Sequence, residues 1–242
     1  MIDIPVPIKL ACLDLSGTTA GDAGTVERAF AEAIATQGVV PGTSAYARAM
    51  VHVHRFRGCP SIDVFRGIFP DNEARAQVTN LAFERSYESA LDRLGMTPLP
   101  GALEALEKLR SSGVKTCLVT GFRRKTFERI LTLLGWHGCI DLHLCSDDVE
   151  RGRPWPDTIL RALTQLEIDD VRKVAVIGDT EADILSGRRA GAAIVAGVLT
   201  GAHSKDRLQQ AGATHIVDTI ADFPALVLDK DLSTHQIPSA AR

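Results

Sequence analysis

The sequence has little excess of charge of either sign. Its 242 residues include 27 Lys and Arg against 30 Asp and Glu, which gives a net charge of -3 and an isoelectric point near 6.2. Such a balance offers little attraction for a polyanion, so we expect neither nucleic acid nor an anionic membrane as a partner. We predict a small-molecule ligand instead.

Long apolar runs and an export signal are also missing. No stretch approaches the ~18 uninterrupted apolar residues that a membrane-spanning helix requires. The N-terminus has no basic region followed by an apolar one, so the sequence does not predict secretion. We therefore expect no membrane contact.

Cysteine pairs of the kind that hold disulfides or zinc are absent. The five cysteines are an odd number, and no two of them have CxxC spacing. This usage argues against a disulfide framework and against a thiolate zinc site. Cys12 and Cys117 lie in apolar runs, where a free thiol behaves as a small hydrophobic side chain. The pattern predicts a reducing, cytoplasmic location.

Two kinds of apolar pattern divide the chain. From about residue 98, short apolar runs alternate with helical patterns, which is typical of a parallel sheet covered by helices. Residues 22–97 show only helical patterns. We predict an α/β fold, with a Rossmann-like parallel sheet core, helices on both faces and an inserted all-helical cap domain. The core would comprise residues 1–21 and 98–242, and the cap residues 22–97.

The expected elements follow from these patterns. Strands are predicted at residues 10–13, 114–119, 140–145, 173–177, 193–198 and 214–217. Helices are predicted at 25–37, 43–51 and 71–94 in the cap, and after Gly101 and at 123–134, 156–167, 180–190 and 204–211 in the core. The polar residues 231–242 are expected to fray.

One short segment places a carboxylate at the end of a buried strand. Residues 9–19 read KLACLDLSGTT, in which Leu10 to Leu13 form the apolar run of a strand buried on both faces. Asp14 follows directly, and open α/β sheets bind ligands at the carboxyl ends of their strands. The turn at Gly17 can aim backbone N–H groups at an anion. Asp14 is therefore a candidate nucleophile, metal ligand or both; the alternative is an Asp that merely begins a polar turn.

Three later segments supply further polar groups at such ends. Thr120 and Gly121 offer a hydroxyl and an amide to a phosphate oxygen, although Thr-Gly is also common in turns. Asp179 follows the strand in VAVIGDTEAD, and Asp183 lies one helical turn later on the same face. Several carboxylates together suit Mg²⁺, which binds one or two of them with substrate phosphate and water. Arg153, in RGRPWPD, is a candidate anion-binding cation or a surface loop residue.

These motifs, in their order, resemble those of the haloacid dehalogenase superfamily of phosphotransferases. They read DLSGTT, LVTG, GRPWPD and VIGDTEAD, with a helical insertion after the first, and GVLTG at 197–201 also fits. The resemblance spans nearly the whole chain. The most similar branch is that of the phosphonatase-like hydrolases, whose helical cap lies where residues 22–97 fall here.

The resemblance implies roles for the acidic residues. Asp14 would be the nucleophile that takes the phosphoryl group as an aspartyl phosphate. Asp14, Asp179 and the main-chain oxygen of Ser16 would hold Mg²⁺, with Asp183 supporting them.

The remaining motif residues suit phosphoryl transfer on physical grounds. This reaction needs positioning and compensation of the charge on the phosphoryl oxygens. Arg153 and Mg²⁺ would supply positive charge, while Thr120 with amides at Gly17 and Gly121 would orient the group. Covalent capture by a carboxylate divides a hard hydrolysis into two easier steps.

Two departures from the family pattern concern proton transfer and imine formation. Most phosphatases of the superfamily carry a second Asp, the general acid, where this chain has Ser16, and such help is worth ~100- to 10,000-fold. Phosphonatases tolerate a small residue there because a cap lysine forms a Schiff base with the substrate aldehyde. Ser61 aligns with that lysine, and no lysine lies between Lys9 and Lys108. We predict that phosphonoacetaldehyde is not cleaved through an imine.

Residues that could replace the acid lie in HVHRFRG, which begins at His52. His54 or His52 could protonate a leaving oxygen, and Arg57 with Arg55 could hold a second anionic group. The alternative is a solvated loop or a packed histidine. An HxH pair near Cys59 could also bind zinc, although the spacing is unspecific.

The leading interpretation is a Mg²⁺-dependent hydrolase of a small phosphate ester or phosphonate, in which the cap closes over the substrate. Two alternatives are carbon–phosphorus hydrolysis without a lysine and a catalytically weak phosphate-binding protein. Dehalogenation is disfavoured because it needs no metal. A monomer and a homodimer fit the sequence equally well.

Overall fold

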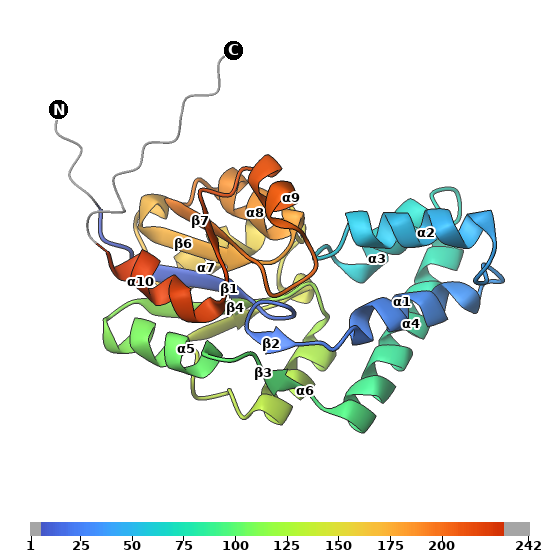
Figure 1. Ribbon diagram of the computed structural model, residues 1–242, viewed down its shortest axis with the longest axis horizontal. Coiled ribbons are helices and arrows are strands. Elements are labelled where there is room, and N and C mark those ends of the chain that lie inside the picture. Colours follow the sequence, from blue (N-terminus) through green and yellow to red (C-terminus); the bar gives the residue numbers. More distant parts are fainter. Residues whose placement is uncertain (1–5, 230–242) are drawn as a thin grey trace, which may run out of the picture.

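A six-stranded parallel sheet forms the centre of the molecule. The computed structural model describes residues 6–229, and the polar segment 231–242 lies outside them. The strand order is β5-β4-β1-β6-β7-β8, with every neighbouring pair parallel (Figure 1). The strands are β1 (Leu10–Asp14), β4 (Lys115–Val119), β5 (Leu142–Leu144), β6 (Val174–Gly178), β7 (Ile194–Val198) and β8 (His215–Val217).

Strand β1 is buried on both faces, as its apolar run predicts. Ala11 and Leu13 belong to one hydrophobic cluster, whereas Leu10 and Cys12 belong to the other. Successive side chains of a strand point to opposite faces, so a central strand needs apolar residues throughout. Cys12 is one of five free cysteines, as expected from the spacing.

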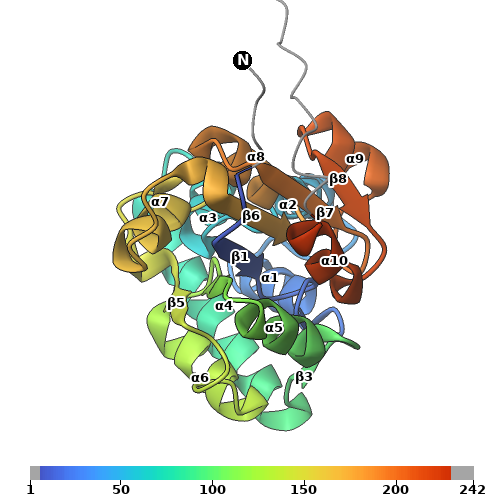
Figure 2. The ribbon, with the colours of Figure 1, turned by 90° about the vertical axis from the view of Figure 1, so that its left-hand side faces the viewer.

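Helices cover both faces of this sheet, which confirms the predicted α/β core. Figure 2 shows α8 and α5 on opposite sides of it. The helices packed with Ala11 and Leu13 are α5 (Ala102–Ser111), α6 (Arg124–Leu134) and α10 (Phe223–Leu228); those on the other face are α7 (Asp157–Gln165), α8 (Glu181–Ala190) and α9 (Lys205–Gln210).

A second group of helices lies beyond one end of the sheet (Figure 1). The chain leaves the core after β2 (Ala20–Gly21) and returns at β3 (Thr97–Pro98), which pair antiparallel. The intervening helices form the predicted helical insertion, and its domain boundaries at 22 and 97 stay predictions. They are α1 (Thr25–Ala35), α2 (Ser44–Arg55), α3 (Ser61–Ile68) and α4 (Glu73–Leu94).

Aromatic side chains hold this cap together. The rings of Phe30 in α1 and Phe83 in α4 are 4.4 Å apart between centroids, and Phe65 in α3 lies 5.2 Å from Phe30. All three side chains are buried. Aromatic rings bury a large apolar area and gain from tilted contacts, so these rings hold α1, α3 and α4 together, within a hydrophobic cluster that continues onto the sheet.

Several expected boundaries are wrong. Helix α2 continues to Arg55 rather than ending near residue 51, because no glycine or proline interrupts the chain before Gly58. Strand β5 is only three residues long, and α10 was not expected from the sequence. In residues 6–229, no helix combines the length and apolar character needed to cross a bilayer.

The register of the sheet brings the motif residues to one edge. Asp14 at the end of β1 pairs with Val119 at the end of β4, so Thr120 lies one residue beyond that pair, at the same edge of the sheet. On the other side Leu13 is in register with Ile177, so Asp179 comes two residues later. The carboxyl ends of β1, β4 and β6 therefore present these side chains together.

The aromatic core of the cap predicts a large cost for truncating Phe65. Phe65→Ala should lower the free energy of unfolding by ~3–5 kcal/mol, because it leaves a cavity beside Phe30 and Phe83. Val51→Ala, at a position 68% exposed on α2, should cost less than ~0.5 kcal/mol. Urea unfolding of both variants measures the difference; equal costs would contradict the packing described.

Candidate active site

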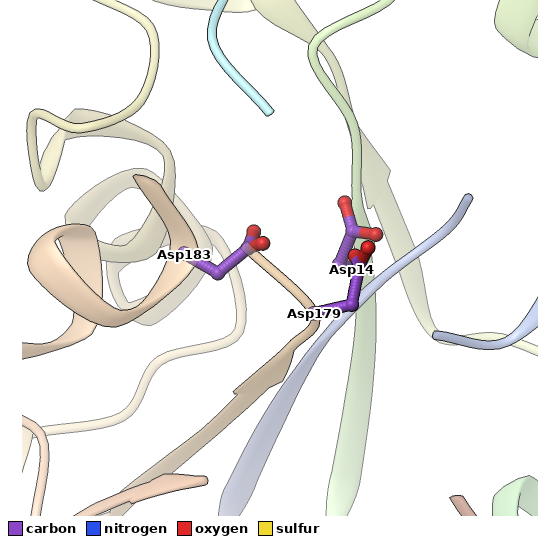
Figure 3. A group of neighbouring side chains, drawn as sticks. All are labelled: Asp14, Asp179 and Asp183. Carbon is purple, nitrogen blue, oxygen red and sulfur yellow. The ribbon is translucent and has the colours of Figure 1, made fainter. Parts of the chain in front are cut away.

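Three carboxylates converge at the carboxyl edge of the sheet. Asp14 ends β1, Asp179 follows β6, and Asp183 projects from the first turn of α8 towards them (Figure 3). One oxygen of each lies within 4.8 Å of the others, and all three residues are buried. The structure therefore brings together the acids that the two motifs predicted.

Backbone and hydroxyl donors hold two of these carboxylates. Asp179 accepts a hydrogen bond from the amide of Ala202 (2.7 Å) and one from the Thr18 hydroxyl (3.3 Å). Asp183 accepts from the amide (3.0 Å) and hydroxyl (2.5 Å) of Thr180, which caps the N-terminus of α8. These bonds orient the carboxylates before any ligand binds.

Gly17 allows the motif loop to pass close to Asp179. Its φ of +90° lies in the left-handed region, and a Cβ there would stand only 2.6 Å from Asp179 Oδ2. The Gly17 carbonyl also accepts a hydrogen bond from the Thr200 hydroxyl, at 2.7 Å. A larger residue would displace the carboxylate or the loop.

Arg153 is the cation of the cluster. Its Nη1 donates to Asp14 Oδ1 at 2.5 Å and also to Asp183 Oδ1, and its side chain is 6% exposed. Its Nε is buried without a hydrogen bond. Arg153 is therefore a buried cation of the site and not a surface loop residue.

One arginine does not balance three buried carboxylates. Burial raises the pKa of Asp14 well above its ordinary value; the charges of Asp183 and Asp179 add to the rise, which Arg153 only partly offsets. Burial likewise raises the pKa of Asp179 to about 6, with the charge of Asp183 as the next cause. A further positive charge would stabilise the ionised cluster.

The donor set fits a magnesium ion. Mg²⁺ prefers oxygen ligands at about 2.0–2.1 Å in octahedral geometry, so opposite ligands lie about 4.2 Å apart. The carboxylate oxygens of the cluster, which lie no more than 4.8 Å apart, are close to that spacing. Within residues 6–229 this is the one group of three acidic, histidine or cysteine side chains close enough to share an ion, so His52, His54 and Cys59 form no zinc site.

A small cavity of about 60 Å³ opens above the cluster. The core contributes the predicted motif residues to its lining, and the cap contributes mainly apolar ones. Its core wall contains Asp14, Ser16, Thr120, Gly121, Arg153 and Asp179. Its cap wall contains Val26, Phe30, Phe56, Arg57, Ser61 and Phe83.

Thr120 and Gly121 form the rim of this cavity next to the cap. The Thr120 hydroxyl accepts a hydrogen bond from the Phe122 amide at 3.2 Å. A Cβ on Gly121 would lie 3.1 Å from the carbonyl oxygens of Gly58 and Cys59, so the cap loop rests against this turn. The turn thus faces both the predicted phosphoryl site and the cap.

The predicted cap residues Arg57 and Ser61 line the cavity, but each already has a partner. Arg57 forms an ion pair with Asp22, at 3.1 Å, and both side chains are largely buried. The Ser61 hydroxyl donates to Asn80 Oδ1 at 2.6 Å.

The two histidines of HVHRFRG do not line the cavity. His54 Nε2 lies 3.2 Å from Glu27 Oε1, with 54% of the side chain exposed. His52 packs against the ring of Phe56, and burial lowers its pKa. Both residues lie in α2 and neither is among the residues that line the cavity, so the acid role predicted for His54 has no geometric support.

Other cavity residues were missed in the sequence. Cys59 and Phe56 come from the loop between α2 and α3, which Gly58 and Pro60 could have marked as a turn. Burial raises the pKa of the Cys59 thiol to about 11.

Two hydroxyls beside the cavity have no hydrogen bond: Ser16 Oγ and Tyr87 Oη, both buried. Burial raises the pKa of Tyr87; Asp22 adds to the rise, and Ser16 and Arg57 oppose it. Tyr87 therefore lies near Ser16, although no pattern in the sequence pairs the two.

Known proteins are similar to this chain in sequence and in fold. The chain is 28% identical over 258 residues to the phosphonoacetaldehyde hydrolase of Pseudomonas aeruginosa, covering 93% of each protein. It is 32% identical over 172 residues to that of Bordetella pertussis, covering 61% of this chain and 62% of the relative. A crystal structure of a phosphonoacetaldehyde hydrolase-like protein from Oleispira antarctica shares the fold, with a TM-score of 0.82, 22% identity and 98% coverage of both chains.

The profile of one family covers the site and most of the sheet. It matches residues 8–191, which include Asp14, Thr120, Arg153, Asp179 and Asp183, and describes haloacid dehalogenase-like hydrolases. Its span exceeds half of the chain, and the relatives named above belong to the phosphonatase-like branch. The chain therefore belongs to the haloacid dehalogenase-like hydrolases and is phosphonatase-like.

Proposed function

We propose that the protein is a Mg²⁺-dependent hydrolase that cleaves a small phosphate ester or phosphonate through an aspartyl phosphate on Asp14. The observation that supports this most is the buried cluster of Asp14, Asp179 and Asp183 beneath a cavity between core and cap, with Arg153 beside it. Asp14, Asp179 and the main-chain oxygen of Ser16 would hold the ion, and Asp183 would support it. When bound, Mg²⁺ neutralises charge on the phosphoryl oxygens.

Each residue has a task in this reaction. Asp14 attacks phosphorus in line with the departing group and later releases phosphate to water. Arg153 offers positive charge to the phosphoryl oxygens, and Thr120 with the amides at Gly17 and Gly121 orients them. The cap wall keeps bulk water from the aspartyl phosphate until the leaving group departs.

Two other functions are less well supported. Carbon–phosphorus cleavage is suggested by the relatives named as phosphonoacetaldehyde hydrolases, but it would have to proceed without a cap lysine. A phosphate-binding protein with weak turnover is suggested by Ser16, whose hydroxyl cannot act as an acid near neutral pH. The cytoplasmic location and the choice between monomer and homodimer stay predictions.

Replacing the nucleophile tests the proposal. Asp14→Asn should lower Mg²⁺-dependent hydrolysis of 4-nitrophenyl phosphate by ~1,000-fold or more, because the amide cannot capture the phosphoryl group. Asp169→Asn, whose side chain is 77% exposed, serves as the control and should retain activity. Turnover that survives in Asp14→Asn, or phosphate-ester binding without turnover in the unmodified protein, would overturn the proposal.

Phosphonoacetaldehyde distinguishes this chain from a lysine-dependent enzyme. No lysine lines the described cavity, and Ser61 takes the place of the cap lysine, so borohydride should trap no adduct. Mass spectrometry of the protein after incubation with substrate and borohydride measures this. A reduced adduct together with consumption of the compound would contradict the expectation.

The raised carboxyl pKa values predict an unusual dependence of stability on pH. The folded protein binds a proton at Asp179 more tightly than the unfolded chain does, since the pKa rises from 3.8 to about 6. This contribution to stability is present below about pH 4 and is lost as the pH rises through about 6; Asp14 acts in the same direction. Millimolar Mg²⁺ should restore stability near pH 7, because it binds the ionised cluster.

The matched variant Asp179→Asn isolates this effect from other carboxylates. In metal-free buffer, the unfolding free energy of the unmodified protein minus that of the variant should fall between about pH 4 and pH 7. With Mg²⁺ the difference should rise again near pH 7. A difference that does not change with pH or with Mg²⁺ would show that Asp179 is not the titrating ligand.

A further inference from the structure

The wall of the cavity opposite the carboxylates is aromatic. Phe30 and Phe83 contribute buried rings, Phe56 contributes a ring that is 38% exposed, and Phe122 extends the surface from the core side. Phe122 in turn stacks on Tyr87, with centroids 4.6 Å apart. A leaving group held between this wall and Asp14 would therefore contact mainly ring faces and edges.

Few polar groups of the cap remain for a substrate. Arg57 is the one charged side chain that the cap contributes to the described lining, and its Nη2 is paired with Asp22; the Ser61 hydroxyl donates to Asn80. A hydroxyl-rich leaving group would lose its bonds to water and find few replacements here, which costs binding energy. An apolar leaving group makes no hydrogen bonds to water and so has none to lose on binding.

Apart from Asp14 and Asp179, which the proposed reaction assigns to the nucleophile and to the ion, the cavity offers no side chain suited to protonate a leaving oxygen. Among its lining residues in the described chain, the hydroxyls of Ser16, Thr120 and Thr180 ionise far above neutral pH, and so does the Cys59 thiol. The neighbouring histidines lie outside it. A leaving group must therefore depart as an anion, which favours an acidic parent alcohol.

We propose, on the basis of the proposed function, that the site selects phosphate monoesters of phenols. Two independent features of the cavity, its aromatic wall and its lack of a proton donor, point to the same class. A phenol has a pKa of about 10, like the tyrosine side chain, whereas an alkyl alcohol lies nearer the value of water, about 16. A phenol is both apolar enough for the aromatic wall and acidic enough to leave as an anion.

The reaction balances without an acid in the first step. A carboxylate oxygen of Asp14 forms a bond to phosphorus while the bond from phosphorus to the aryl oxygen breaks, and the electron pair leaves with the phenolate. Water then attacks phosphorus, the bond from phosphorus to Asp14 breaks, and inorganic phosphate departs. One proton of that water ends on the phenolate through solvent, so the sum is ester plus water giving phenol plus phosphate.

Four substrates separate the two features. Phenyl phosphate has an apolar leaving group whose parent alcohol is acidic, and cyclohexyl phosphate has an apolar leaving group whose parent alcohol is only weakly acidic. Acetyl phosphate has a polar leaving group whose parent acid is more acidic than a phenol, and glycerol phosphate has a polar leaving group whose parent alcohol is only weakly acidic. Phenyl and cyclohexyl phosphate should share a KM roughly 10- to 100-fold below those of the polar pair, as burial of a ring-sized group implies. Phenyl phosphate should have a kcat at least ~100-fold above those of cyclohexyl and glycerol phosphate, and acetyl phosphate, whose leaving group is more acidic still, a kcat no lower than that of phenyl phosphate.

A kcat for cyclohexyl phosphate within tenfold of that for phenyl phosphate would overturn the inference, as would a KM for glycerol phosphate equal to that of cyclohexyl phosphate. Such results, with Mg²⁺-dependent turnover that needs Asp14, would leave the proposed function intact. Turnover of none of the four compounds would overturn both.

Ser16→Asp tests the missing donor directly. A carboxyl group placed there should raise the kcat for cyclohexyl phosphate relative to phenyl phosphate by at least ~10-fold. A ratio that does not change in a folded variant would contradict the inference. The substrate series on the unmodified protein tests it independently if the variant does not fold.

Tyr87→Phe is the control for an overlooked donor, because Tyr87 lies near Ser16. The ratio of kcat for 4-nitrophenyl phosphate to that for phenyl phosphate should stay the same in this variant. If Tyr87 donates a proton to the leaving oxygen, the less acidic phenol loses more rate and the ratio rises. Such a rise would overturn the inference.

Discussion

The site depends on the burial of three carboxylates beside a single arginine. Asp14, Asp179 and Asp183 are buried at the base of the cavity, and Arg153 compensates only part of their charge. Charges in such surroundings interact strongly, so the cluster either takes up protons or takes up a cation. The raised pKa values of Asp14 and Asp179 correspond to the uptake of protons, and bound magnesium would be the cation. Hydrogen bonds from the backbone amides of Ala202 and Thr180 keep Asp179 and Asp183 in place in either state.

The cap shapes the cavity because its loop is held against the core. The last carbonyls of α2, at His54 and Arg55, accept hydrogen bonds from His203 (2.9 Å) and Arg207 (2.7 Å) of the core. Cationic and polar donors at a helix C-terminus are favourable because unpaired carbonyls gather there. Gly58 lies so close to Thr180 that a Cβ would collide with its side chain. His54, which the sequence suggested as an acid, thus serves this contact through its backbone.

Strand ends were the most predictable feature, because their signal is local. An apolar run buried on both faces, followed by Asp14 or Asp179, needs only the rules of a parallel sheet to predict which edge the acid occupies. The position of His54 could not be predicted in this way, since it depends on where α2 ends. No glycine or proline ends α2 before Gly58, and the α2–α3 loop that follows packs against Thr180 and Gly121, residues far away in the chain. The nearness of Tyr87 to Ser16 is likewise a property of two domains meeting.

Position 16 carries a serine in place of a general acid, and the cavity wall opposite the carboxylates is aromatic; both features concern the leaving group. An enzyme without a proton donor loses rate in proportion to the basicity of its leaving group, so its cavity gains nothing by binding alkyl or sugar groups tightly. Aromatic rings in the wall favour the binding of aryl groups, and an aryl group departs readily with its oxygen as a phenolate anion. A cap lined with polar side chains would instead collect substrates that this catalytic centre converts slowly. In the proposed reaction, the lining of the cap and Ser16 therefore favour the same chemical class of substrate.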